Sequence, residues 1–155
     1  MPSTPFEEVP GSPAARPIAG PRVFPARMDA FPSVRSFVEE VCRAAAFGRD
    51  DCAKLVLLIE ELFTNTVLHG HGGDSDASVH ITFEVADGQI SLTYEDAARP
   101  HDPFASWKPP DAASSVEDRR VGGLGVVLVA SMAQRVRYAY TAGRNRICLV
   151  MVRSS

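Results

Sequence analysis

Apolar residues recur with helical spacing in two stretches of the N-terminal half of the chain. They fall at intervals of three and four residues between residues 31 and 47, and again between residues 51 and 69. This period places them on one face of an α-helix, so we predict two amphipathic helices. The buried faces would be formed by Val34, Phe37, Val38, Val41 and Ala45 in the first helix and by Leu55, Leu58, Ile59, Leu62, Phe63 and Thr66 in the second.

Local signals predict where both helices begin and end. Pro32 suits the first turn of the first helix, because a proline there removes no helical hydrogen bond. Gly48 is expected to end that helix and Gly70 to end the second one. Asp50 and Asp51 would supply the cap and the first-turn negative charge of the second helix, where the helix dipole favours an anion.

Alternation of apolar and polar residues predicts strands in the second half of the chain. It occurs over residues 79–85 and 90–94, on either side of Asp87-Gly88, a pair that is typical of a tight hairpin turn. Further strands are expected over residues 22–27, 136–140 and 147–152. Helices grouped against a mostly antiparallel sheet predict an α+β fold, a two-layer α/β sandwich with the helices on one face.

The parity of one strand places an acid on the buried face. Ile90, Leu92 and Tyr94 alternate, and Asp96 continues the series. A carboxylate on the core side of a strand is costly unless it has a partner. Asp96 is therefore expected either to cap the next turn or to accept a hydrogen bond from a buried ligand amine.

A pair of polar residues lies on the second predicted helix. Glu61 and Asn65 are four residues apart, so they lie one above the other on the helix surface. Asparagine is unfavourable inside a helix, because its side chain competes for backbone hydrogen bonds. The pair suits a site where a carboxylate accepts a proton and an amide oxygen binds Mg²⁺. The alternative is an ordinary solvated helix face.

The stretch from residue 97 to residue 121 has no periodicity, which indicates a functional loop or a disordered insertion. It ends with Arg119 and Arg120, shortly before a glycine-rich turn that runs into an apolar helix. Glycines at a helix start let backbone N–H groups face a phosphate, although they also serve close packing. The glycine-rich turn consists of Gly122, Gly123, Leu124 and Gly125.

The composition of the chain limits the classes of protein to which it can belong. The chain has 155 residues, a hydrophobic content of 45% and a net charge of −3, values expected of one soluble domain and not of a nucleic-acid-binding protein. No apolar run is long enough to cross a bilayer, and no secretory signal is apparent, which indicates a cytoplasmic protein without a membrane partner. Six prolines fall within residues 1–21. We expect a flexible tail there and a single domain over residues 22–155.

The cysteines and histidines do not form a metal-binding pattern. Cys42, Cys52 and Cys148 are odd in number and lack paired spacing, so reduced and mostly buried thiols are expected. His69 and His71 are two residues apart, and no cysteine or carboxylate cluster joins them at ligand spacing.

Four motifs, in a fixed order, resemble the ATP-binding fold shared by histidine kinases, DNA gyrase and the Hsp90-type chaperones. The chain is most similar to the small bacterial anti-sigma regulatory factors with serine-protein kinase activity, over about residues 22–153. The motifs are Glu61-Leu-Phe-Thr-Asn65 followed by His69-Gly70, then Asp96-Ala-Ala-Arg-Pro-His-Asp-Pro103, then Val121-Gly-Gly-Leu-Gly-Val126, then Gly143-Arg-Asn-Arg-Ile-Cys-Leu149.

The resemblance implies a role for each motif. Glu61 would be the general base, Asn65 the magnesium ligand and Asp96 the contact to the adenine amino group of ATP. The loop residues Ala98 and Arg120 would lie at the nucleotide. The amides of Gly123 and Gly125 would receive phosphate oxygens, with Gly122 and Leu124 also at the nucleotide.

Three positions depart from the family's pattern. Ala98 stands where the family usually has glycine, so its methyl group could crowd adenine or shift the loop. His101 replaces a common phenylalanine. Cys148 stands where a threonine often supports the adenine contact.

The resemblance also implies a function and partners. The chain would be an ATP- and Mg²⁺-dependent serine protein kinase that phosphorylates an anti-sigma-factor antagonist and otherwise holds a sigma factor, as a homodimer. The alternative is a nucleotide-binding regulatory module that sequesters a protein partner without transferring phosphate. A relic that binds no nucleotide is the third hypothesis.

Overall fold

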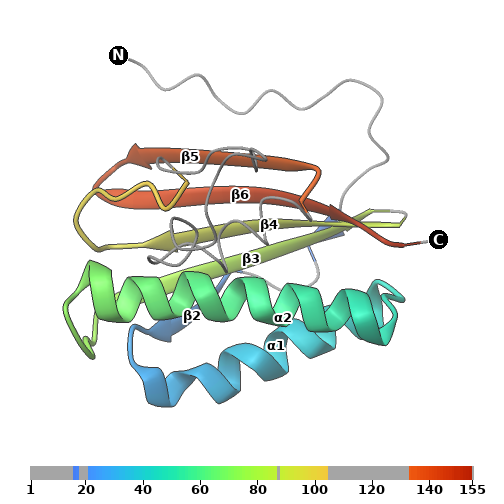
Figure 1. The fold of residues 1–155 in the computed structure, drawn as a ribbon, viewed down its shortest axis with the longest axis horizontal. Helices are drawn as coiled ribbons and strands as arrows, with labels where there is room; N and C mark the ends of the chain where they lie inside the picture. The colour runs from blue at the N-terminus through green and yellow to red at the C-terminus, as the bar shows by residue number, and fades with distance from the viewer. Residues whose placement is uncertain (1–15, 18–20, 87, 105–132, 155) are drawn as a thin grey trace, which may run out of the picture.

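The computed structural model describes residues 16–17, 21–86, 88–104 and 133–154. Two helices, α1 (Phe31–Ala44) and α2 (Arg49–Thr64), lie side by side on one face of an antiparallel sheet (Figure 1). The predicted α+β two-layer sandwich is confirmed. None of the helices in these ranges is long and apolar enough to cross a bilayer.

The sheet is built from two hairpins laid edge to edge. Strand β3 (Ser78–Ala86) pairs with β4 (Gln89–Asp96), β4 pairs with β6 (Arg144–Val152), and β6 pairs with β5 (Arg135–Thr141). In this register Asp96 lies opposite Asn145. The final residue of β4 therefore meets the beginning of β6.

The other edge of the sheet carries two short strands. Both β2 (Arg22–Pro25) and β1 (Arg16–Pro17) pair with β3. Arg16 and Pro17 fall within the expected tail, so this part of the tail is aligned with the sheet. The division of the chain at residue 21 stays a prediction.

The two helices differ from the prediction at the turn that joins them. The first helix ends at Ala44, and the chain reverses at Ala46, which has a positive φ of 55°. Gly48 is not the terminator, because its extended backbone makes it the residue that precedes the first turn of α2. Asp50 and Asp51 lie in the first turn as expected, but no side chain caps it.

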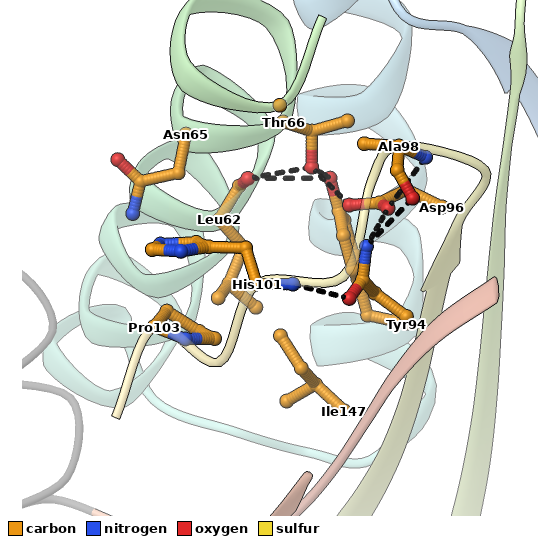
Figure 2. A pocket seen from close by; sticks show the side chains of 11 residues that line it. Leu62, Asn65, Thr66, Tyr94, Asp96, Ala98, His101, Pro103 and Ile147 are labelled. Atoms are coloured by element: carbon orange, nitrogen blue, oxygen red, sulfur yellow. Dashed lines mark hydrogen bonds between the residues drawn. The ribbon is translucent and has the colours of Figure 1, made fainter. Parts of the chain in front are cut away.

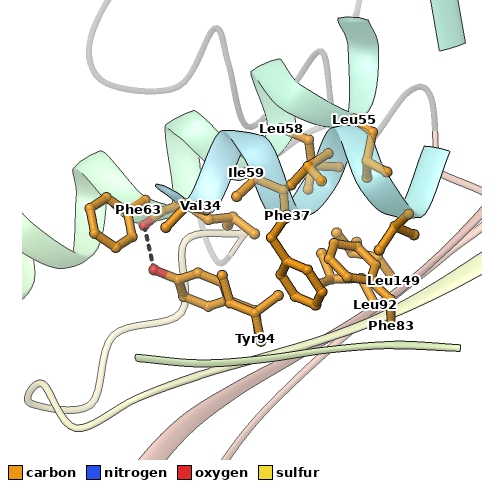
Figure 3. Packing of buried hydrophobic residues seen from close by; sticks show 14 of the residues in the cluster. Val34, Phe37, Leu55, Leu58, Ile59, Phe63, Phe83, Leu92, Tyr94 and Leu149 are labelled. Atoms are coloured by element: carbon orange, nitrogen blue, oxygen red, sulfur yellow. Dashed lines mark hydrogen bonds between the residues drawn. The ribbon is translucent and has the colours of Figure 1, made fainter. Parts of the chain in front are cut away.

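Side chains from both layers form one apolar core (Figure 3). Phe37 of α1 packs edge-on against Phe83 of β3, with ring centroids 5.2 Å apart. Leu58 and Ile59 of α2 are fully buried in the same cluster. The predicted apolar faces therefore cover the sheet, and they bring the C-terminal end of α2 over the end of β4.

Asp51 joins the start of α2 to the end of the chain. Its carboxylate accepts hydrogen bonds from the backbone N–H of Ser154 at 2.9 Å and from the Ser154 hydroxyl at 2.8 Å. The backbone hydrogen bond lowers the pKa of Asp51, burial opposes this shift, and the hydroxyl hydrogen bond adds to it.

We expect this contact to stabilise the fold only while Asp51 is ionised. Because the folded-state pKa is depressed, the stabilisation is present above the unfolded pKa of about 3.9. It is lost as the pH falls through the folded value. The free energy of unfolding of Asp51→Asn should be lower than wild type at pH 7 by roughly 1–3 kcal/mol. The gap should close in denaturant titrations taken to pH 2. A gap independent of pH would contradict the prediction.

Candidate functional site

The candidate site begins where α2 changes its winding. The α-helix ends at Thr64, and η2 (Asn65–Gly70) continues it as a π-helical turn. Such turns insert a residue into the helical period and often occur at functional sites. Here the turn begins at Asn65, and it lies over the end of β4, beside the loop that begins at residue 97 (Figure 2).

Asp96 lies on the buried face of β4, as its parity predicts, and is 7% exposed. One carboxylate oxygen, Oδ2, accepts the Thr66 hydroxyl at 2.8 Å. The other, Oδ1, accepts the Ala98 backbone N–H at 3.1 Å and the Asn145 amide at 2.8 Å. An ionised carboxylate offers about four lone-pair directions. Three donors from this chain therefore leave room for one more.

Thr66 connects Asp96 to the core through hydrogen bonds. Its Oγ1 lies 2.7 Å from the Tyr94 hydroxyl and 3.0 Å from the Leu62 carbonyl oxygen. Because an ionised carboxylate only accepts, the Thr66 proton belongs to Asp96 and the Tyr94 proton to Thr66 or Leu62. Burial raises the pKa of Tyr94 far above its ordinary value. The phenol thus stays a neutral donor.

Asn145 is the residue that the sequence analysis missed. Its side chain is buried, and its amide nitrogen also lies 3.1 Å from the Ala98 carbonyl oxygen and 2.9 Å from that of Arg99. Its amide oxygen accepts the His101 backbone N–H at 2.9 Å and the Tyr138 hydroxyl. One side chain therefore ties Asp96 and the following loop to the last hairpin.

The expectation that Cys148 stands at the position supporting the adenine contact is wrong. Cys148 lies on the opposite face of β6, near Thr93 Oγ1 at 3.9 Å, because it alternates with the buried Ile147 and Leu149. Asn145 belongs to that buried series and occupies the place expected for a supporting side chain. The parity of β6 was the available signal.

Two adjoining hollows lie at this end of the sheet. The inner hollow, about 20 Å³, is lined by Asp96, Thr66 and Ala98, with apolar walls from Leu62, Tyr94 and Ile147. The outer hollow, about 460 Å³, is lined by polar side chains that include His69 and Arg99. Asn65 and His101 line both hollows. The apolar walls and the acid at their end are the kind of lining that a flat base requires, while the enclosed space itself holds about one water molecule. The wider polar hollow suits the charged remainder of a nucleotide.

Asn65 lines both hollows, and Figure 2 shows its side chain among those that line the inner one. Within the described ranges, no hydrogen bond engages its side-chain amide. A half-buried amide oxygen without a protein donor fits one ligand position of Mg²⁺, which otherwise keeps its waters or takes phosphate oxygens. These same ranges contain no cluster of three or more metal-ligating side chains. Asn65 would therefore hold the ion together with the nucleotide.

Ala98 is accommodated by the glycine that ends η2. A Cβ atom added at Gly70 would lie 2.8 Å from the Ala98 Cβ, closer than side chains normally approach. Ala98 is 4% exposed. Its methyl group therefore lines the inner hollow and at the same time fills the space that Gly70 leaves open.

Gly70→Ala is expected to destabilise the fold by about 1–3 kcal/mol, because the new methyl group overpacks against Ala98. Adding Ala98→Gly should restore most of that loss. Urea unfolding of the wild type, both single variants and the double variant measures the coupling. Strictly additive effects would show that the two methyl groups do not meet.

The predicted set of site residues also includes Glu61 and the glycine-rich turn. Glu61 is half-buried on α2, one turn before Asn65, and lines neither hollow. Arg120, Gly122, Gly123, Leu124 and Gly125 lie outside the described residues. The structure therefore brings together Asn65, Asp96 and Ala98 from the predicted set.

The chain is similar to known proteins over most of its length. The sequence profile of the histidine kinase-like ATPase domain matches residues 24–151. The serine/threonine-protein kinase BtrW of Bordetella bronchiseptica is 28% identical over 95 residues, which cover 61% of this chain and 66% of that protein. The serine-protein kinase RsbW of Bacillus licheniformis is 23% identical over 122 residues, covering 77% and 76% respectively.

A solved structure supports the fold. The RsbU and RsbW domains of a Mycobacterium tuberculosis protein align with a TM-score of 0.60 and 19% identity, covering 88% of this chain and 33% of that chain. The present chain thus spans about two thirds of the Bordetella protein and one third of the mycobacterial chain. At this identity the likeness concerns the fold.

Proposed function

This chain belongs to the histidine kinase-like ATPase domain family, and on that premise we propose that it is an ATP-dependent serine protein kinase of the anti-sigma type. The observation that carries the proposal is the convergence of Asn65 and Asp96, from different elements, on the same inner hollow. Related proteins that carry the name serine-protein kinase support it.

The nucleotide would bind with its base toward Asp96. The remaining lone pair of the carboxylate would accept the adenine amino group, while Thr66 and Asn145 keep the carboxylate in place. Bound Mg²⁺ would supply neutralisation of phosphate charge, with Asn65 as its protein ligand. Gly122–Gly125 and Arg120 are proposed to receive phosphate oxygens.

Glu61 is proposed as the general base that takes the proton of the attacking serine hydroxyl. Phosphoryl transfer depends mostly on positioning and charge neutralisation, so a base need only reach the incoming hydroxyl. Glu61 lies outside the hollows and is half-exposed on the same helix as Asn65. A protein substrate would therefore have to deliver its serine along this helix face.

The partner would be an anti-sigma-factor antagonist. Phosphorylation adds about −1.5 to −2 charge at the modified serine, which would weaken a docked interface and release the antagonist. The released kinase, as a homodimer in the cytoplasm, would then bind a sigma factor or an equivalent regulator.

A second candidate function is a nucleotide-dependent binding module that sequesters its partner without phosphoryl transfer. The position of Glu61 outside both hollows favours this alternative. This alternative predicts that the chain still binds nucleotide but that no partner protein acquires phosphoserine.

Calorimetric titration of the full chain with ADP and ATP, with and without Mg²⁺, tests the proposal. We expect magnesium-dependent binding, followed by transfer of the γ-phosphate to serine in a candidate antagonist. Binding without transfer to any candidate would favour the sequestering module. The absence of binding at millimolar nucleotide would overturn both functions.

Asn65→Ala is expected to abolish the magnesium dependence of nucleotide binding. The variant removes the amide oxygen but leaves the contacts to the base, so metal-free ADP affinity should stay near wild type. Thr64→Ala, the neighbouring half-buried position, is the matched control. An unchanged response to Mg²⁺ in Asn65→Ala would remove this residue as the ligand.

A further inference from the structure

The backbone of His101 is held in place, whereas its ring is unengaged. Its N–H donates to the Asn145 amide oxygen at 2.9 Å and lies 3.1 Å from the Tyr138 hydroxyl oxygen. Over the ranges that the structure describes, no hydrogen bond or ion pair engages the imidazole, and the residue is exposed. A fixed backbone that carries an unengaged polar ring suits a side chain that contacts a ligand.

His101 borders both hollows of the candidate site. It lines the inner hollow, which ends at Asp96, and also the outer polar hollow, and it shares this position with Asn65 and Pro103. Figure 2 shows the His101 side chain extending from the loop toward the helix that carries Asn65. A ligand whose base faces Asp96 and whose charged part occupies the outer hollow must therefore pass His101.

The outer hollow offers an anion more donors than acceptors. Arg99 lines it, and its guanidinium donates to the His69 carbonyl oxygen at 3.3 Å. His69 and His101 also line it, and an imidazole carries at least one ring N–H in either protonation state. Among the described residues that line this hollow, Asp102 is the one carboxylate, and its Oδ1 accepts the Phe104 backbone N–H at 2.8 Å. This lining favours phosphate.

We propose that His101 is a specificity-determining residue that recognises the phosphate nearest the ribose, so that the site distinguishes a nucleoside 5′-phosphate from a nucleoside. The inference rests on the proposed nucleotide site and adds to it a protein donor for the first phosphate. With the adenine amino group at Asp96, the opposite side of the base carries the ribose toward His101. A ring N–H of His101 then donates to a phosphate oxygen, and hydrogen bonds to charged acceptors are among the stronger ones.

The same side chain also helps to make room for the base. The inner hollow holds about one water molecule, so a base enters only when groups that border it move. The backbone N–H groups of Ala98 and His101 are both held by side chains of the sheet. The imidazole can change rotamer without breaking a hydrogen bond, and exposed side chains do so rapidly. We expect it to turn toward the outer hollow, where the phosphate lies, when nucleotide binds.

Equilibrium dialysis of the full chain with labelled adenosine, AMP and ADP, in the presence of EDTA, tests the proposal. The chelator removes any contribution of a metal at Asn65. Wild type is expected to bind AMP roughly tenfold more tightly than adenosine, the lower end for a hydrogen bond to a charged group. In His101→Phe this preference should largely disappear, because phenylalanine has no donor. The ratio of ADP affinity to AMP affinity should stay as in wild type.

Two further variants serve as controls. His101→Gln keeps an N–H donor and should retain most of the preference for AMP over adenosine. His80→Gln removes an imidazole elsewhere. His80 lies opposite Glu95 in the register of β3 and β4, beside Arg144, and lines neither hollow. His80→Gln should bind all three ligands as wild type does.

The possible failures differ in what they overturn. If His101→Phe kept the wild-type ratio of AMP to adenosine affinity, or if wild type bound the two equally, the proposal would be wrong while the nucleotide site stood. Equal losses of adenosine and AMP in His101→Phe would also overturn it and would assign the imidazole to the base instead. If wild type bound none of the three ligands at millimolar concentration, the proposed function would fail together with this inference.

Discussion

Glu61→Gln is expected to lower the rate of phosphate transfer to a serine partner by about 10²- to 10⁴-fold, the usual worth of a general base. Glutamine keeps the shape of the side chain but cannot take the serine proton. Because Glu61 lines neither hollow, the affinity for ATP should stay within about twofold of wild type, by the ordinary size of a surface substitution. Single-turnover transfer of labelled phosphate, with calorimetry beside it, measures both quantities.

Glu60 is the matched control for this experiment. It is the preceding residue of α2, and its side chain is exposed on the outer face of the helix pair. Glu60→Gln should transfer phosphate at the wild-type rate. Equal losses in both variants would indicate a change in docking of the protein substrate, and full activity of Glu61→Gln would exclude Glu61 as the base.

Asp96→Asn is expected to weaken ADP binding by roughly 10- to 150-fold, since a hydrogen bond to a charged group is worth about 1.5–3 kcal/mol. The amide oxygen can keep the donors that Oδ1 holds, Ala98 N–H and Asn145. The amide nitrogen would then face Thr66, whose hydroxyl can turn its proton to the Leu62 carbonyl oxygen at 3.0 Å. The fold is preserved, and the free acceptor for the adenine amine is lost.

The neighbouring Glu95 separates this effect from a general loss of charge. It lies on the other face of β4, where it pairs with Arg144 and Arg146. Glu95→Gln should bind ADP as wild type does. If calorimetry found Asp96→Asn unaltered while its thermal midpoint fell, Asp96 would be a structural cap on the next turn, the other role that its position allows.

The helices and strands, and the face of β4 on which Asp96 lies, follow from short-range patterns in the sequence. The period of apolar residues predicted both helices, and alternation predicted the two strands of the first hairpin, because solvent exclusion acts on each element in the same way wherever it packs. The parity of Ile90, Leu92 and Tyr94 placed Asp96 on the core side. The same argument applied to β6 would have placed Asn145 there as well.

Contacts between distant segments could not be predicted in this way. The sequence pattern placed Thr66 on an apolar helix face. Only the register of the sheet, together with the π-helical turn, brings its hydroxyl to Asp96. The Gly70–Ala98 contact depends on how closely η2 approaches the loop.

The sequence by itself determined the layers of this protein, the order of its elements and the residues that give the site its chemical character, Asn65 and Asp96. These features depend on the local period of burial and on the chemistry of single side chains. The tertiary structure alone decided which donors hold Asp96 and where Glu61 lies relative to the hollows. Such pairings depend on strand register, helix winding and packing distance, which are settled by the whole chain at once.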